Sequence, residues 1–274
     1  MLLTEKHTKQ FAFFYLLCFL INYSWFWFNG LLFSSINPVF FLNRLDFTRN
    51  VLMLSNIQRF LVYNRSLRIC FDVLYLSLPI LLTIAAIKDF RGKTLIAFCS
   101  IVFTIIYGIF FTSISYISIE GYISWILIPL ILSAVTVKGF YYYLHAVRII
   151  FILILVSAAI WKFRGMSIFN IEQMAGILLK QHNAWLVSNN DWFTKCVNFL
   201  VQHEAISYIL FLLATVAELL FAVGLFTRKY DRALIILFCL FLVFDFFLMR
   251  INYFTWMVFM GCFYFSTFPL QARK

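Results

Sequence analysis

The chain has 274 residues, of which 64% are hydrophobic and only 12% are charged. Soluble globular domains are about half apolar and about one quarter charged, so this composition excludes a soluble domain and indicates a polytopic membrane protein. The net charge of +11 does not indicate nucleic-acid binding. The basic residues are scattered through short loops, where they serve as topology signals and contact anionic lipids.

Eight segments are apolar and long enough to cross a membrane, which needs about 17–25 mostly apolar residues. We therefore expect an all-α bundle of about eight transmembrane helices that forms a single domain over residues 1–274. The segments are 11–29, 67–87, 94–112, 119–137, 141–163, 204–226, 232–249 and 252–269. Only Lys138, Gly139 and Phe140 lie between the fourth segment and the fifth, so seven spans remain an alternative.

The distribution of Lys and Arg predicts that the N-terminus, the turn at 88–93 and the C-terminus are cytoplasmic. Two long connections, 30–66 and 164–203, then fall on the outer face. Apolar residues recur among polar ones in both connections, so we expect short amphipathic helices there. The membrane that we expect is a bacterial cytoplasmic membrane.

Ionisable residues inside the apolar segments are the best clue to function. A charge in hydrocarbon costs at least ~2.5–3.5 kcal/mol, so such a side chain usually has a partner or faces a wet cavity. At 1.5 Å of rise per residue, Arg148 and Glu218 both lie roughly 10–12 Å from the cytoplasmic ends of their spans. We predict that they form a buried structural ion pair, with a proton or substrate site as the alternative.

A second group of ionisable residues lies toward the predicted outer face. Asp245 is flanked by two phenylalanines near the end of its span, and Lys162 lies at the end of the fifth span. If the two are neighbours, they form an acid–base pair in which Lys162 is a candidate base, so both are candidate catalytic residues. The alternative for Lys162 is a lysine that extends its ammonium group into the headgroups.

Four further residues are candidates for substrate binding. Asp72 begins the second span and Arg250 follows the seventh, while His182 and Trp185 lie in the connection 164–203. The pattern predicts no metal site, because the six cysteines contain no C-x-x-C pair and the histidines lack ligand spacing. No nucleotide-binding or hydrolase motif is present, and no cofactor is evident, although a quinone or a lipid is compatible with the chain.

From Tyr141 onward the chain resembles the HTTM superfamily, whose multi-spanning membrane domains are related to vitamin K-dependent gamma-carboxylase. Four pieces carry the resemblance in order. They are a helix that ends Trp161-Lys162-Phe163, a polar segment with Trp185 and Trp192, Ala217-Glu218-Leu219 followed by Arg228 and Arg232, and Phe244-Asp245 followed by Asn252-Tyr253-Phe254-Thr255-Trp256.

This resemblance implies that Lys162 corresponds to the lysine that acts as a base in the carboxylase. Asp245 stands where the family typically has His, and the large lumenal domain of the carboxylase has no counterpart in this chain. The stretch from Ala217 to Arg228 also resembles the Glu…Gly-Leu-x-x-Arg stretch of DoxX and MauE-type redox-associated membrane proteins.

The function predicted from these features is to assist the maturation, modification or export of a peptide or lipid-linked substrate at the outer face. The alternative is a non-catalytic membrane scaffold or a subunit of a larger complex, and a DoxX/MauE-like redox protein or a transporter comes third. The expected partners are membrane lipids and a membrane or secreted protein, but no nucleic acid.

Overall fold

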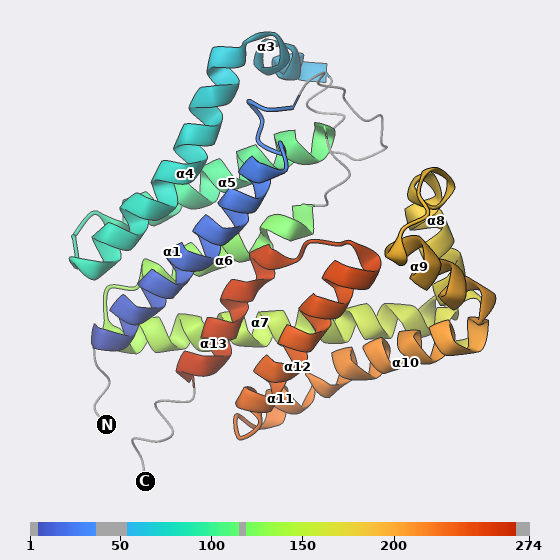
Figure 1. Ribbon diagram of the computed structural model, residues 1–274. Helices are drawn as coiled ribbons and strands as arrows, with labels where there is room; N and C mark the ends of the chain where they lie inside the picture. Colours follow the sequence, from blue (N-terminus) through green and yellow to red (C-terminus); the bar gives the residue numbers. More distant parts are fainter. Residues whose placement is uncertain (1–4, 37–53, 115–118, 267–274) are drawn as a thin grey trace. The chain divides into compact units, whose positions relative to one another are not determined.

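The computed structural model describes residues 5–36, 54–114 and 119–266, and all regular elements in these ranges are helical (Figure 1). The first half contains α1 (Glu5–Phe28), α3 (Ile57–Tyr63), α4 (Arg65–Ile87), α5 (Lys93–Ile114), η1 (Ile119–Tyr122), α6 (Ile123–Leu132) and α7 (Val137–Arg164). The second half contains η2 (Ser167–Phe169), α8 (Gln173–Ser188), α9 (Trp192–Gln202), α10 (Glu204–Leu220), α11 (Val223–Phe226), α12 (Asp231–Phe244), the π-helix η3 (Asp245–Met249), η4 (Phe254–Val258) and α13 (Phe259–Ser266).

Six of the described helices are long and apolar enough to cross a membrane, so the chain is a multi-pass integral membrane protein with an all-α fold. They are Lys6–Phe28, Arg65–Ile87, Lys93–Thr112, Val137–Arg164, Glu204–Phe226 and Asp231–Met249. This number is smaller than the eight spans that the sequence predicts. The orientation of the chain in the membrane stays a prediction.

The two remaining predicted spans are shorter than expected. In place of 119–137 the α-helix is Ile123–Leu132, and in place of 252–269 the described helical stretch is Phe254–Ser266, with 267–269 outside the described residues. A ten-residue α-helix is only about 15 Å long, half the thickness of the hydrocarbon core. Hydropathy counts apolar residues across a helix end, so it overestimated the span 119–137.

The junction between α6 and α7 also decides against the alternative of seven spans. Helix α6 ends at Leu132, and α7 begins at Val137, four residues before the predicted start of the fifth span. Thr136 accepts a hydrogen bond from the backbone N–H of Gly139 (3.0 Å), which caps the first turn of α7. The two apolar segments are therefore separate helices.

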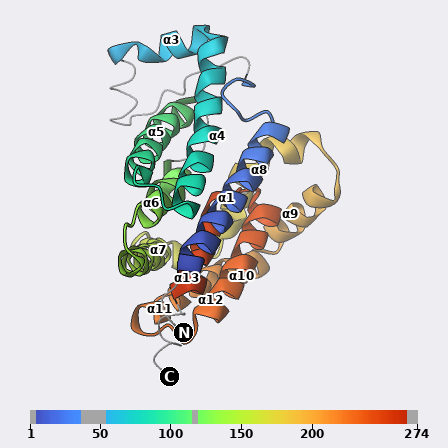
Figure 2. The ribbon, with the colours of Figure 1, turned by 90° about the vertical axis from the view of Figure 1, so that its left-hand side faces the viewer.

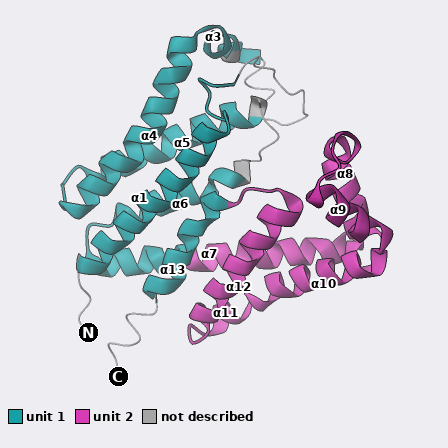
Figure 3. Ribbon diagram, in the orientation of Figure 1, with its two compact units in different colours: residues 1–147, 254–274 teal, residues 148–253 magenta. Residues whose placement is uncertain are grey.

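The contacts divide the chain into two compact units (Figure 3), and the single domain expected from the sequence stays a prediction. Unit 1 contains residues 1–147 and 254–274, and unit 2 contains residues 148–253. Helix α7 contributes its first part to unit 1 and the rest to unit 2.

Unit 1 is a helix bundle with an aromatic core. Helix α4 packs on α1 and α5, and α6 packs on α5 and α4 (Figure 2). Within this bundle the rings of Tyr75 on α4 and Tyr107 on α5 stack with centroids 4.1 Å apart, and Tyr122 and Trp125 are buried beside other aromatic rings. The many phenylalanine and tyrosine residues of the chain therefore serve largely to pack its helices.

Unit 2 contains the two helices expected within the connection 164–203. Helices α8 and α9 pack on each other and on α10. Their buried apolar side chains form one cluster with Phe211 of α10, and its members on α8 and α9 are Met174, Leu178, Phe193, Val197 and Leu200. The predicted helices of the connection 30–66 fall partly on residues 37–53, which lie outside the described residues, and the described part contains α3.

Candidate functional site

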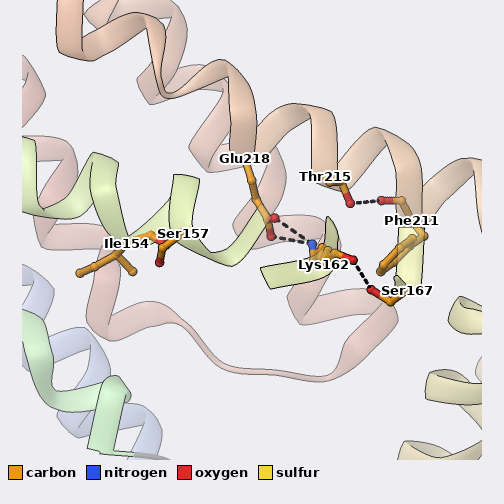
Figure 4. A network of polar contacts seen from close by, with 7 residues as sticks. All are labelled: Ile154, Ser157, Lys162, Ser167, Phe211, Thr215 and Glu218. Carbon is orange, nitrogen blue, oxygen red and sulfur yellow. Dashed lines mark hydrogen bonds and ion pairs between the residues drawn. The ribbon is translucent and has the colours of Figure 1, made fainter. Parts of the chain in front are cut away.

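A lysine and a glutamate from two membrane-spanning helices meet in unit 2 (Figure 4). Lys162 lies in the last turn of α7, and its Nζ atom is 2.8 Å from both carboxylate oxygens of Glu218 on α10. The Glu218 side chain is 7% exposed and the Lys162 side chain 24% exposed. The ammonium group also lies over the ring of Phe211, 5.3 Å from its centroid. The ion pair is thus mostly buried, and its cationic member is the more accessible one.

Asp245 adds a second carboxyl group to this pair. It is the first residue of the π-helix η3, it is 8% exposed, and it interacts electrostatically with both Glu218 and Lys162. Among the described residues, no donor makes a hydrogen bond to its carboxyl group. The two candidate catalytic residues, Lys162 and Asp245, therefore interact electrostatically, and Glu218 joins them in a cluster of one described ammonium group and two carboxyl groups.

The predicted ion pair between Arg148 and Glu218 is wrong, because Glu218 pairs with Lys162 and Arg148 pairs with Asp231. Arg148 Nε donates to Asp231 at 2.9 Å, and a second guanidinium nitrogen donates to the other carboxylate oxygen. The two side chains are 1% and 0% exposed. The depth estimate failed because α7 begins before position 141 and α10 ends at Leu220, which changes the distance of each residue from its helix end.

The sequence did not single out Asp231 as a functional or structural group. Asp231 is the first residue of α12, and it lies one residue before the predicted span 232–249. The sequence does contain a signal that could have indicated its role. Asp231 is an acidic residue next to the start of an apolar segment, and the N-terminus of a helix favours a negative charge.

Gly224 on α11 lies close to the buried Arg148–Asp231 pair. A Cβ atom at this position would lie 2.8 Å from Ile152 Cδ1 and 3.3 Å from an Arg148 guanidinium nitrogen. The backbone of α11 therefore approaches α7 more closely than a residue with a side chain would allow. The glycine shared by the DoxX-like stretch thus has a packing role in this chain.

We predict that Gly224→Leu lowers the free energy of unfolding by about 1–3 kcal/mol through overpacking, and that Gly224→Ala has a smaller effect. Denaturant titration of the purified chain measures both values. Gly176→Ala is the matched control, because a Cβ at Gly176 meets nothing within 4 Å and alanine favours a helix. If Gly224→Leu is as stable as this control, the close approach of α11 to α7 is incorrect.

Three of the four predicted substrate-binding residues come together around the end of η3. His182 and Trp185 lie about one turn apart on α8, and His182 Nε2 is 3.1 Å from the carbonyl oxygen of Leu248 on η3. The guanidinium of Arg250 lies 4.2 Å from the centroid of the Trp185 ring and 3.9 Å from that of Phe193. Two aromatic rings therefore contact this cation, each at a distance typical of a cation–π interaction.

His182 lies outside the membrane-spanning helices, and burial lowers its pKa from the ordinary value of 6.5, with the positive charge of Arg250 acting in the same direction. The unfolded chain thus binds a proton on this residue at a higher pH than the folded chain does. The stability contributed by neutral His182 is therefore present above about pH 6.5 and decreases as the pH falls below it.

We predict that His182→Gln removes this component of the pH dependence. The unfolding midpoints of both proteins at pH 7.5 and pH 5.5 are the measurement. The wild-type midpoint should fall more on acidification than that of His182→Gln, because glutamine has no proton to gain. Equal shifts in the two proteins would contradict the lowered pKa of His182.

Asp72, the fourth predicted substrate-binding residue, lies in unit 1 and binds the turn after α1. Its carboxylate accepts hydrogen bonds from the backbone N–H groups of Phe33 (3.2 Å) and Ser34 (2.8 Å) and from the hydroxyl of Tyr107 (2.9 Å). The side chain is buried, and Arg68, one turn earlier on α4, donates to the carbonyl oxygens of the same turn. These contacts give Asp72 a structural role, and its part in substrate binding stays a prediction.

Neither a family model, nor a curated protein, nor a solved structure matches this chain. Within the described ranges, no three residues among His, Cys, Asp and Glu gather closely enough to hold a metal ion. The functional argument therefore rests on the residues of the chain itself, and above all on the cluster of Lys162, Glu218 and Asp245.

Proposed function

We propose that the chain is a membrane protein that helps to mature, modify or export a peptide or lipid-linked substrate, and that Lys162 is its proton-exchanging group. The observation that carries this proposal is the ion pair of the Lys162 ammonium with the mostly buried Glu218 carboxylate, to which the buried Asp245 carboxyl group adds an electrostatic interaction. Ionisable residues that are retained inside membrane-spanning helices commonly serve proton or substrate pathways.

The cluster has the components of a general base. If the Lys162 ammonium passes a proton to one carboxylate, a neutral amine remains that can accept a proton from a substrate. Lys162 is the most accessible of the three, so it is the group that a substrate would contact. The resemblance to the HTTM superfamily supports the same assignment, since Lys162 stands at the position of the lysine base.

The proposal predicts that Lys162→Met abolishes the function of the chain without preventing its folding. Mass spectrometry of secreted peptides and membrane lipids should detect the same unprocessed or retained product in cells with this variant as in cells lacking the chain. Asp245→Asn should give the same product, because the amide keeps the shape but not the charge of the carboxylate.

Lys138→Met is the matched control. Lys138 lies on the same helix, α7, but it is exposed and lies over the ring of Tyr142. Cells with this variant should be indistinguishable from wild type. The proposal fails if the folded Lys162→Met variant also restores every wild-type product.

A membrane scaffold is the second candidate, and the Arg148–Asp231 pair favours it. Both side chains are fully buried and bound to each other, as expected for a contact that orders helices. A scaffold would tolerate Lys162→Met and would co-purify with one particular membrane partner. The Lys162→Met experiment thus separates the two candidates.

A further inference from the structure

The π-helix η3 has an unusual C-terminus, which lies four residues after Asp245. The backbone N–H groups of Arg250 and Ile251 both bind the carbonyl oxygen of Asp245. Arg250 has a positive φ of 50°, in the left-handed region that ends the helix. The last carbonyl groups of η3 consequently need partners from elsewhere in the protein.

Helix α8 supplies these partners from two consecutive residues. Gln181 Nε2 donates to the carbonyl oxygen of Met249, and His182 Nε2 lies 3.1 Å from that of Leu248. Since the acceptor is a carbonyl oxygen, His182 must carry a proton on Nε2. One turn farther along α8, Trp185 contacts the guanidinium of Arg250. Three side chains of one helix therefore bind three successive residues at the end of η3.

Apolar packing reinforces these hydrogen bonds. Leu248 and Met249 pack against the cluster of α8, α9 and Phe211 side chains described above. Phe193 of this cluster contacts both the ring of His182 and the guanidinium of Arg250. One end of η3 is thus bound tightly by α8 and α9, while its other end carries Asp245, whose carboxyl group receives no hydrogen bond from a described residue.

We propose that Gln181 and His182 are positioning residues, which hold η3 so that Asp245 stays beside Lys162 and Glu218. The role of Asp245 in this statement rests on the proposed function, but its placement does not. A π-turn is shifted by changes in its terminal hydrogen bonds, because it is a local departure from the α-helical pattern. Loss of the two donors should therefore release Asp245 and leave Glu218 bound to Lys162.

The reactivity of the two carboxyl groups tests this inference in the purified full-length chain. N,N′-dicyclohexylcarbodiimide, an apolar reagent for buried carboxyl groups, is added, and mass spectrometry follows the modification of Asp245 and Glu218 separately. In the double variant Gln181→Leu and His182→Phe, Asp245 should react about thirtyfold faster, the factor expected for the loss of two hydrogen bonds of restraint. The rate at Glu218 should remain that of the wild type.

Two single substitutions keep the test decisive. His182→Gln retains an N–H donor near the position of Nε2 and should restore the wild-type rate at Asp245, whereas His182→Phe alone should not. Val187→Ala is the control on the same helix, since the Val187 side chain is 83% exposed. An unchanged rate at Asp245 in the double variant would overturn the inference, as would equal increases at Asp245 and Glu218.

These outcomes are independent of the cellular experiment. If Lys162→Met leaves the products in cells unchanged while the double variant exposes Asp245 selectively, the proposed function fails and the positioning role stands. If Lys162→Met abolishes the function but the labelling of Asp245 does not change, the positioning role fails alone.

Discussion

Arg148→Met is expected to destabilise the folded chain by about 3–5 kcal/mol, because it leaves the Asp231 carboxylate buried without its partner. Asp231→Leu should have a similar effect, since it removes the carboxylate that accepts two hydrogen bonds from a guanidinium group that is 1% exposed. The free energy of unfolding, measured with denaturant in mixed micelles, gives both values. Among the substitutions in unit 2, these should have the largest effect on stability.

The double variant Arg148→Met and Asp231→Leu should recover most of the lost stability. Replacing a buried ion pair with apolar residues of similar size is often neutral or stabilising, because the cost of removing two charges from water disappears. A double variant that is as unstable as the sum of the single variants would show that the two side chains do not act as a pair.

The transmembrane character and the helical fold follow directly from composition, and the two helices of the connection 164–203 follow from its apolar periodicity. The exact spans do not, because hydropathy continues across places where the backbone leaves the helix. Between Leu132 and Val137, for example, four residues end one helix and begin the next, although none of the four is charged. Local backbone geometry is what divides this stretch.

The candidate site could be predicted in part. Lys162 and Asp245 were expected to be neighbours because both lie near the same end of their spans, and they do share a cluster. The partner of Glu218 was assigned wrongly, because depth along a helix says nothing of the direction in which a side chain points around its axis. Lys162 is a long side chain at a helix end, so it can reach a carboxylate at a different depth.

Two other features of the site leave no signal in the sequence. The π-helix begins at Asp245 within an apolar run that continues the pattern of α12. The contacts of Gln181 and His182 with η3 depend on tertiary packing between segments more than 60 residues apart. Residues of this kind look like ordinary polar members of an amphipathic helix, so only the structure connects them with Asp245.

Asp72→Leu is expected to be the most destabilising substitution in unit 1, with a loss of about 3–5 kcal/mol, because it leaves several buried donors unpaired at once. The carboxylate accepts from two backbone N–H groups and from the hydroxyl of Tyr107. Denaturant titration measures the loss. Asp72→Asn should cost less, because the amide oxygen retains part of the accepting capacity.

Tyr107→Phe is the control that compares the loss of one hydrogen bond to Asp72 with the loss of the whole carboxylate. It removes one of the three donors and leaves the carboxylate bound to the backbone of the turn, so we expect a loss of about 1 kcal/mol. Because Asp72 has a structural role, the folded fraction of Asp72→Asn should retain the cellular function that Lys162→Met abolishes. A stable Asp72→Leu protein without function would instead return Asp72 to the substrate-binding residues.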